Sequence, residues 1–251
     1  MTQPKPENEA KSEKEFLASY NIHDFDVPLT SVDMVIFTVK DEQLKVLLVK
    51  RAQYPAKGKW ALPGGFIDVK RDKSLDDTAF RKLLEKTGVK TPYLEQVSSF
   101  GGSKRDPRGW ALTVAYFALI SSNAIELKNN ESTEEVRWVS VDEVSSNYKL
   151  AFDHQAILDA CKERLRNKVQ YTSLPVNLLP NTFTLTELQQ TFEVVLQQPV
   201  AKKSFRKRIL DAGILEDTGE LKTGSNRPAK LYRVLPDGDN HFFTRNLEGP
   251  R

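Results

Sequence analysis

The sequence predicts an α+β domain followed by a second, smaller domain of helices and a β-hairpin. Apolar β-type runs occupy the first half of the chain, Pro175 and Pro180 mark a change of character after residue 170, and basic residues gather near the C-terminus. A chain of 251 residues is long enough for two modest domains, each with its own core. We therefore assign an N-terminal extension to 1–20, the first domain to 21–168, the second to 169–240 and a tail to 241–251.

The composition indicates a cytoplasmic protein without a membrane segment. Hydrophobic residues make up 39% of the chain, and no apolar run approaches the roughly 18 residues of a membrane span. The N-terminus does not resemble a secretion signal. The single cysteine, Cys161, excludes a disulfide within the chain and fits a reducing compartment.

The N-terminal third predicts a short helix and a β-hairpin. The first ten residues are polar, and we expect them to be disordered. A short helix is expected from Lys11 to Tyr20. Two apolar β-type runs, Leu29–Val39 and Gln43–Val49, predict a hairpin across residues 40–42.

The stretch from Trp60 to Val89 predicts a strand, a glycine-rich loop and a helix. The segment Leu62-Pro63-Gly64-Gly65 is expected to leave the strand, because two glycines allow a positive φ or a close approach of the backbone to a ligand. Ser74 is the expected N-cap of the helix, with acidic residues in its first turn, and Gly88 is the expected C-cap.

Three more β-type runs complete the predicted first domain: Tyr93–Phe100, Trp110–Ile120 and Val136–Val139. Residues 101–109, GGSKRDPRG, are expected to form a mobile basic loop between the first two. An amphipathic helix is expected over Phe152–Lys168.

The second domain predicts a winged helix-turn-helix. Thr184 and Glu187 form a capping box that opens one helix, and a basic helix follows over about Ala201–Asp211. Ile214-Leu215 and Leu231–Val234 are expected to pair as a hairpin around a long basic tip. A helix, a tight turn, a basic helix and a basic hairpin in this order are typical of DNA-binding domains.

The charge of this second domain favours a polyanionic partner. Between Pro199 and Arg233, nine Lys and Arg residues outnumber four Asp and Glu residues, in a chain whose net charge is only +3. Arg208 is expected to point outward with the other basic residues of the helix. The alternative to DNA binding is that these residues only form a solvated face. The predicted DNA-binding residues are Lys202, Lys203, Ser204, Arg206, Lys207, Lys222, Arg227 and Lys230.

The glycine-rich loop and its helix resemble a known motif. Gly64-Gly65, Arg81, Leu83, Glu85 and Gly88-Val89 are similar to the Nudix box, G-x5-E-x7-R-E-U-x-E-E-x-G-U with U apolar. The resemblance implies an α/β/α sandwich. It also implies hydrolysis of phosphate anhydrides with divalent metals that the glutamates of the box hold.

Three of the four glutamates of that box are missing. Lys82 and Lys86 stand at the first and last helix positions, and Glu85 alone remains. The loop is two residues longer than the pattern, so Arg71 or Lys73 falls at the loop glutamate. Because Mg²⁺ prefers carboxylate oxygens, we predict a site that binds a diphosphate without hydrolysing it efficiently. We assign no catalytic residue and no metal ligand.

The candidate ligand-binding residues each have a second interpretation. Lys82 and Lys86 either replace the missing metal or are solvated surface charges. Arg51 is a phosphate or base contact by resemblance to sugar-nucleotide Nudix proteins, or an exposed charge at a strand end. His154 is a ligand or interface contact, or a plain residue of a helix start. The predicted set is Arg51, Gly64, Gly65, Arg81, Lys82, Glu85, Lys86, Arg105, Arg108 and His154.

Arg105 and Arg108 suit a phosphate or a stacked adenine, although a plain hairpin loop explains them as well. Nudix enzymes that cleave ADP-ribose often carry their general base on a loop comparable to the one holding Glu131, Glu134 and Glu135. Weak residual hydrolysis is therefore one interpretation of these residues, and solvated charges are the other.

A Nudix-like domain followed by a winged helix resembles the Nudix-related transcriptional regulators of bacterial NAD metabolism. The resemblance extends from about Leu29 to Val234 and includes Ala151-Phe152-Asp153-His154 and Phe183–Leu210. It implies a homodimeric repressor that senses ADP-ribose or a related NAD metabolite, needs no cofactor, and leaves a palindromic double-stranded DNA operator when the ligand binds.

Two other function classes compete with this repressor. One is an active hydrolase of ADP-ribose or another nucleoside diphosphate derivative, and the other is a basic protein–protein adaptor. For the repressor, we expect closure of the pocket to rotate the winged helices through the Phe152–Lys168 helix and the linker after it.

Overall fold

A mixed sheet of seven strands forms the centre of the first domain in the computed structural model, which describes residues 12–89, 93–122, 133–223 and 228–244. The main strand order is β3-β2-β1-β6-β5, with β4 paired to β1 and β7 paired to β2. β1 and β6 are parallel, and the other pairs are antiparallel. The strands are β1 (Leu29–Lys40), β2 (Gln43–Arg51), β3 (Trp60–Ala61), β4 (Gly64–Phe66), β5 (Tyr93–Asp106), β6 (Gly109–Leu119) and β7 (Thr133–Ser140).

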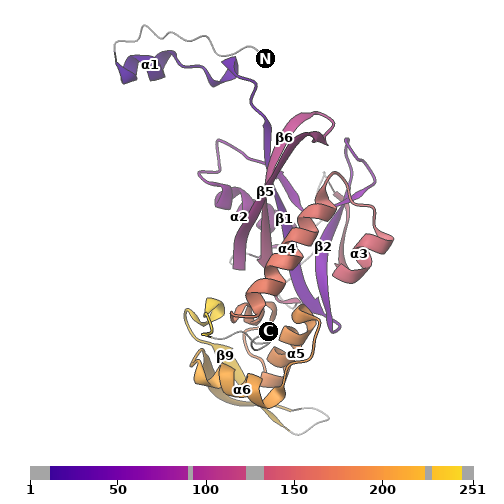
Figure 1. The fold of residues 1–251 in the computed structure, drawn as a ribbon, viewed down its shortest axis with the longest axis vertical. Coiled ribbons are helices and arrows are strands. Elements are labelled where there is room, and N and C mark those ends of the chain that lie inside the picture. Colours follow the sequence, from indigo (N-terminus) through magenta and orange to yellow (C-terminus); the bar gives the residue numbers. More distant parts are fainter. Residues whose placement is uncertain (1–11, 90–92, 123–132, 224–227, 245–251) are drawn as a thin grey trace.

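Helices cover both faces of this sheet, as Figure 1 shows. In β1, Val32, Met34 and Ile36 pack with Ala79 and Leu83 of α2 (Leu75–Thr87). The alternate residues face the other way, so Val35 and Phe37 share a core with α3 (Val141–Asn147) and α4 (His154–Val169). This alternation of buried residues on a strand with two covered faces produces the predicted α/β/α sandwich.

The predicted hairpin and the predicted ends of α2 are confirmed. β1 and β2 pair from Phe37↔Val46 to Lys40↔Gln43 around a turn with positive φ at both of its central residues. Ser74 caps α2 in a reciprocal capping box with Asp77, and Gly88 ends the helix at φ 72°. The expected N-terminal helix is α1 (Glu13–Ser19), followed by the 3-10 turn η1 (Ile22–Asp24). The first ten residues lie outside the described ranges.

Two predicted loops are strands. Gly64–Phe66 pairs with Ser31–Asp33 as β4, so the glycine segment starts a new strand directly after the turn at Leu62-Pro63. The prediction of a mobile loop at 101–109 is also wrong. β5 continues through a bulge to Asp106, which pairs with Gly109, because backbone hydrogen bonds carry the hairpin to its tip.

The second domain is a winged helix with the predicted order of two helices and a hairpin. Its elements are η3 (Leu174–Leu178), α5 (Leu185–Leu196), α6 (Lys202–Asp211), β8 (Leu215–Lys222), β9 (Ala229–Val234) and η4 (Gly238–Asn240). The capping box of Thr184 and Glu187 is present. The rings of Phe192 on α5 and Phe205 on α6 pack edge to face, with their centroids 5.1 Å apart. The strands of the wing are longer than predicted and leave a shorter tip.

The two domains share one core. Leu174, Pro175 and Val176 of the expected linker are buried, and they join α4 residues such as Leu165 to the core of the winged helix. The proline-marked boundary therefore lies in a packed segment, because the apolar residues between the prolines turn inward.

The C-terminal segment packs at this junction and is not a free tail at its start. The Phe243 N–H donates to the Tyr171 carbonyl oxygen at 2.8 Å. The Arg208 guanidinium lies 4.6 Å from the centre of the Phe243 ring, so Arg208 is half-buried and does not point outward as predicted. No helix of the described residues is long and apolar enough to cross a membrane.

Candidate ligand pocket and nucleic-acid interface

A cavity of about 740 Å³ opens at one edge of the first domain, between β1, β2, β4, α2, the tip of the β5–β6 hairpin and the start of α4. All ten residues predicted for the ligand site line it. This volume lies in the usual range of small-molecule sites. Among the described lining residues, eight are Lys or Arg and four are Asp or Glu, a balance that favours an anionic ligand.

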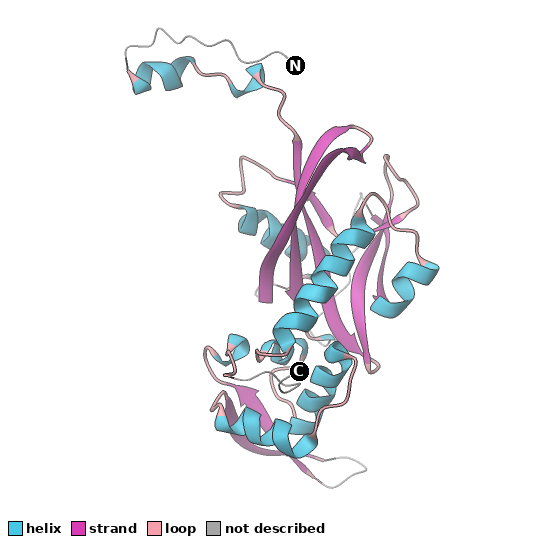
Figure 2. Cartoon of the chain, in the orientation of Figure 1, coloured by secondary structure: helices cyan, strands magenta, loops and turns pink. Residues whose placement is uncertain are grey.

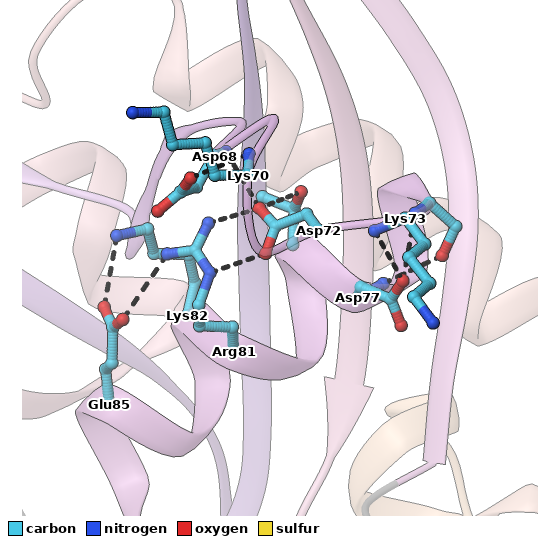
Figure 3. Close-up of polar contacts among 10 residues, drawn as sticks. Asp68, Lys70, Asp72, Lys73, Asp77, Arg81, Lys82 and Glu85 are labelled. Atoms are coloured by element: carbon cyan, nitrogen blue, oxygen red, sulfur yellow. Dashed lines mark hydrogen bonds and ion pairs between the residues drawn. The ribbon is translucent and has the colours of Figure 1, made fainter.

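The α2 side of the pocket is built around Arg81 (Figure 3). Its Nε and Nη2 donate to the two oxygens of Asp72 at 2.7 and 2.5 Å. The Asp72 side chain is 2% exposed, and these hydrogen bonds hold the pKa of its carboxyl well below the ordinary value. Counting along the motif placed Arg71 or Lys73 at the loop glutamate and missed Asp72, which lies between them.

Lys82 and Lys86 both face the cavity. Lys82 Nζ lies 3.1 Å from Glu85 Oε2, and its stem crosses Gly65 so closely that a Cβ atom there would lie 2.8 Å from Lys82 Cε. Lys86 is only 5% exposed and donates to Thr133 Oγ1. The interpretation of Lys86 as a solvated surface charge is therefore wrong.

Burial alters the chemistry of Lys86. It lowers the pKa of the ammonium group to about 8, and the neighbouring charge of Lys82 adds to the effect. A lysine in this state is charged at neutral pH and has little surrounding water, so an anion that reaches it replaces few water molecules.

The Arg105 side chain is buried at the hairpin tip. Its Nη2 donates to Asp33 Oδ2 at 2.6 Å, and its Nε donates to Asp153 Oδ2 at 3.0 Å. His154 lies beside this network, and its Nδ1 accepts the Leu62 N–H at 2.9 Å. Burial lowers the pKa of His154, which matches the neutral ring that this bond requires. The sequence analysis missed Asp33, although an aspartate within an apolar strand is itself a signal.

Two arginines stack on aromatic rings in the pocket. The Arg51 guanidinium lies 5.1 Å from the centre of the Phe152 ring, and that of Arg108 lies 5.1 Å from the centre of the Phe66 ring. Arg51 is half-buried and donates to the Pro55 carbonyl oxygen, so it is not an exposed charge at a strand end. Stacked pairs of this kind suit a planar base as well as a phosphate.

The described residues include no group of three or more His, Cys, Asp or Glu placed to hold a metal ion. Glu134 and Glu135 lie on β7, where they pair with Lys50 and Arg137, and neither lines the cavity. The loop that was expected to carry a general base is therefore a strand at these two positions. Glu131 lies outside the described residues.

The exposed face of α6 carries the predicted DNA contacts. Lys202, Lys203, Ser204 and Lys207 are exposed, and within the described part of the chain no hydrogen bond or ion pair holds their side chains. Arg206 is half-buried and donates to Thr186 Oγ1 at 3.0 Å. Figure 2 shows α6 and the wing at the end of the molecule far from the N-terminal arm.

The wing lysines differ from those of α6 because each has an acidic partner. Lys222 Nζ lies 2.6 Å from Glu187 Oε1, and Lys230 Nζ lies 2.7 Å from Asp217 Oδ2. Arg227 lies outside the described residues. The geometry thus brings a basic helix and a basic wing together, as helix-turn-helix DNA readers require.

Known proteins share both halves of this architecture. Residues 28–161 match the Nudix domain, and residues 175–234 match the NrtR DNA-binding winged helix domain. The chain is 48% identical over 240 residues to the ADPR responsive transcriptional repressor NtrR of Acinetobacter baylyi, covering 96% of this chain and 95% of that protein. The chain belongs to the NrtR family. Its Nudix and winged helix domains are those of an NrtR regulator.

Solved NrtR structures agree with this fold. The structure of Shewanella oneidensis NrtR complexed with a 27mer DNA superposes with a TM-score of 0.81 at 46% identity, over 87% of this chain and 99% of that one. The Nudix domain of the same protein complexed with ADP ribose superposes with a TM-score of 0.57 at 46% identity, over 61% of this chain and 99% of that domain.

Proposed function

We propose that this chain is a DNA-binding transcriptional repressor of NAD metabolism genes that leaves its operator when ADP-ribose, or a related NAD metabolite, fills the pocket. The observation that carries the proposal is its likeness, over nearly the whole length, to an ADPR responsive repressor. The family likeness and the DNA-binding surface also favour action in the cytoplasm as a homodimer on a palindromic double-stranded operator.

The pocket supports a diphosphate-containing ligand. Lys82 and Lys86 occupy positions where Nudix enzymes carry metal-binding glutamates, and both residues line the cavity. We infer that they neutralise the diphosphate in place of a metal, while Arg51 and Arg108 with their aromatic partners receive the base and the outer ribose. Binding then needs neither a metal nor another cofactor.

Efficient hydrolysis is not part of the proposed function. Nudix chemistry uses carboxylate-bound metal ions to activate water and stabilise the leaving phosphate. Here Glu85 is the one acidic residue left among the three helix positions, and Lys82 already pairs with it.

The runner-up is a Nudix hydrolase of ADP-ribose or another nucleoside diphosphate derivative. The match of residues 28–161 to the Nudix domain favours it. Incubation of ADP-ribose with the protein and Mn²⁺, followed by chromatography of AMP, tests this alternative. Steady turnover would replace the repressor as the leading function.

Fluorescence anisotropy tests the proposal directly. A duplex selected by the protein from a random-sequence pool is titrated with the protein at fixed salt, with and without ADP-ribose in EDTA. Specific binding that ADP-ribose weakens is the expected result. If isothermal titration in EDTA shows no ADP-ribose binding, the hypothesis that Lys82 and Lys86 take the place of a metal ion is wrong.

A further inference from the structure

A strained segment connects the pocket to α4. Phe152 lies in the left-handed region at φ 53°, which a bulky side chain rarely adopts. Its ring lies against the Arg51 guanidinium in the cavity lining, and the next two residues are Asp153, the N-cap of α4, and His154, the first residue of α4. Strain of this kind persists where surrounding contacts impose it, and it gathers at sites that switch.

Asp153 stands at the N-cap of α4 but does not cap it. An aspartate at this position normally accepts a hydrogen bond from a backbone N–H of the first turn. Here the side chain makes no capping hydrogen bond, and Oδ2 instead accepts from Arg105 Nε. Within the described residues, Oδ1 is buried and has no hydrogen-bond partner. The carboxylate thus has Arg105 as its partner, and the first turn of α4 receives no capping hydrogen bond from it.

Arg105 is the partner that a ligand competes for. It lines the cavity, its side chain is 8% exposed, and its guanidinium holds both Asp33 and Asp153. An anionic ligand that draws this guanidinium toward itself takes it from Asp153 more readily than from Asp33. The Asp33 contact is the shorter, 2.6 Å against 3.0 Å, and Asp33 is the less exposed of the two.

The far end of α4 reaches the winged helix. Leu165 and Val169 are fully buried in the core that α4 shares with α5, and Lys168 Nζ lies 2.6 Å from Glu95 Oε2 of β5. Figure 1 shows α4 running along the sheet toward α5 and α6. α4 therefore connects the pocket to the DNA-binding domain as one continuous helix.

We propose that Asp153 is a positioning residue that couples the pocket to the operator: Arg105 holds its carboxylate when the protein binds DNA, and the carboxylate turns to cap α4 when the ligand takes Arg105. The inference rests on the proposed function and adds its switching residue. It requires two alternative partners for one side chain, which is the minimum that a two-state element needs.

Two substitutions separate the two partners. Asp153→Asn cannot form the ion pair but still caps a helix, whereas Asp153→Ala does neither. We expect D153N to bind ADP-ribose about three- to tenfold more tightly than wild type, and the ratio of operator Kd values with and without ADP-ribose to fall by a similar factor. D153A should gain less ligand affinity than D153N. Asp159→Asn, an exposed position on the same helix, should match wild type.

Each outcome of these measurements either supports or overturns the inference. Ligand affinity that rises while the coupling ratio falls supports the inference, because damage to the fold lowers both. D153N with the wild-type ligand affinity and ratio overturns it, and so does D153N that loses both together with a lower Tm. Wild-type protein whose operator binding ignores ADP-ribose overturns the proposed function as well as the inference, so this titration is made first.

Discussion

The pocket and the α6 surface both carry basic residues, but the pocket holds several that are mostly buried and paired, whereas the lysines of α6 are exposed and unpaired in the described chain. In the pocket, Arg81, Lys82 and Arg105 are each held by an acidic side chain within 3.1 Å and are mostly buried. On α6, Lys202, Lys203 and Lys207 are exposed, and the described chain gives them no acidic partner.

This difference separates two kinds of recognition. Buried and paired cations have fixed positions, so they suit a small ligand whose charges must meet them in one geometry. Exposed lysines move freely, so they suit a polyanion that offers phosphates along a line and releases counterions on binding. The two sites should therefore respond differently to charge removal, pH and salt.

The largest expected effect is on DNA binding. The triple variant K202Q/K203Q/K207Q should lower operator affinity by about 10²- to 10³-fold and reduce the slope of log K against log salt by about 3, since each lysine neutralises a phosphate. ADP-ribose affinity should not change. Anisotropy at several KCl concentrations and isothermal titration measure the two quantities.

A matched control removes the same charge elsewhere. Lys14, Lys40 and Lys149 are exposed on the first domain or on its N-terminal arm. If K14Q/K40Q/K149Q weakens operator binding as much as the α6 triple variant, net charge rather than the α6 surface determines the affinity.

The next effect is in the pocket. K82E/K86E restores two of the three missing carboxylates of the Nudix box, and it should weaken ADP-ribose binding in EDTA by about 10- to 100-fold, the loss expected for one or two charged hydrogen bonds. Mn²⁺ should recover part of the affinity because the new carboxylates can hold it. Isothermal titration with and without Mn²⁺ measures both.

The exposed double variant K40E/K73E carries the same charge change outside the cavity lining. It should bind ADP-ribose as wild type does in EDTA. K82E/K86E with undiminished affinity in EDTA would mean that the two lysines do not contact the diphosphate.

Local patterns in the sequence were enough to predict most helices and strands of the fold. Ser74 and Gly88 define the ends of α2, and Thr184 with Glu187 defines the start of α5, because caps are interactions between near neighbours. The errors concern partners distant in the sequence. Gly64–Phe66 is a strand because Ser31–Asp33 lies beside it, and no feature of the glycine pair itself indicates that.

The site followed the same rule. All ten predicted pocket residues line the cavity, since a family motif and basic residues near it were visible in the sequence. Apart from Glu85, which pairs with Lys82, the acids that hold them were not predicted. Asp72 is hidden by the two-residue insertion, while Asp33 and Asp153 reach Arg105 across 72 and 48 residues of sequence. Such pairs are decided by packing rather than by spacing.

A smaller effect should come from pH. Lys86 has a pKa of about 8 in the folded protein against an ordinary 10.5, so it loses its charge as pH rises through 8. ADP-ribose affinity should fall by about five- to tenfold between pH 7 and 9, because the neutral amine no longer attracts the diphosphate. Lys82 and Glu85 are the nearby charged groups that act on this pKa.

The K86R variant is the control for this titration, because a guanidinium keeps its charge throughout the range. Its ADP-ribose affinity should be nearly flat from pH 7 to 9. The effect of pH on stability has the opposite sign to its effect on ligand affinity. Between pH 8 and 10.5 the unfolded chain binds a proton that the folded Lys86 does not, so the contribution of this lysine to the free energy of unfolding rises with pH. If the ligand affinity of the wild type changes with pH as little as that of K86R, Lys86 does not contact the ligand.

The smallest effect concerns the wing, where the DNA-binding surface resembles the pocket. Lys222 pairs with Glu187, which also caps α5 through the Thr184 N–H at 2.8 Å. Glu187→Gln keeps a capping side chain but releases Lys222, so operator affinity should rise by about two- to threefold, the scale of one exposed ion pair. Glu220→Gln removes an equal charge from the exposed wing without freeing Lys222. Equal gains from both variants would mean that wing charge alone acts. A gain confined to E187Q would mean that DNA binding first has to break an internal ion pair on the wing, a cost that the lysines of α6 avoid.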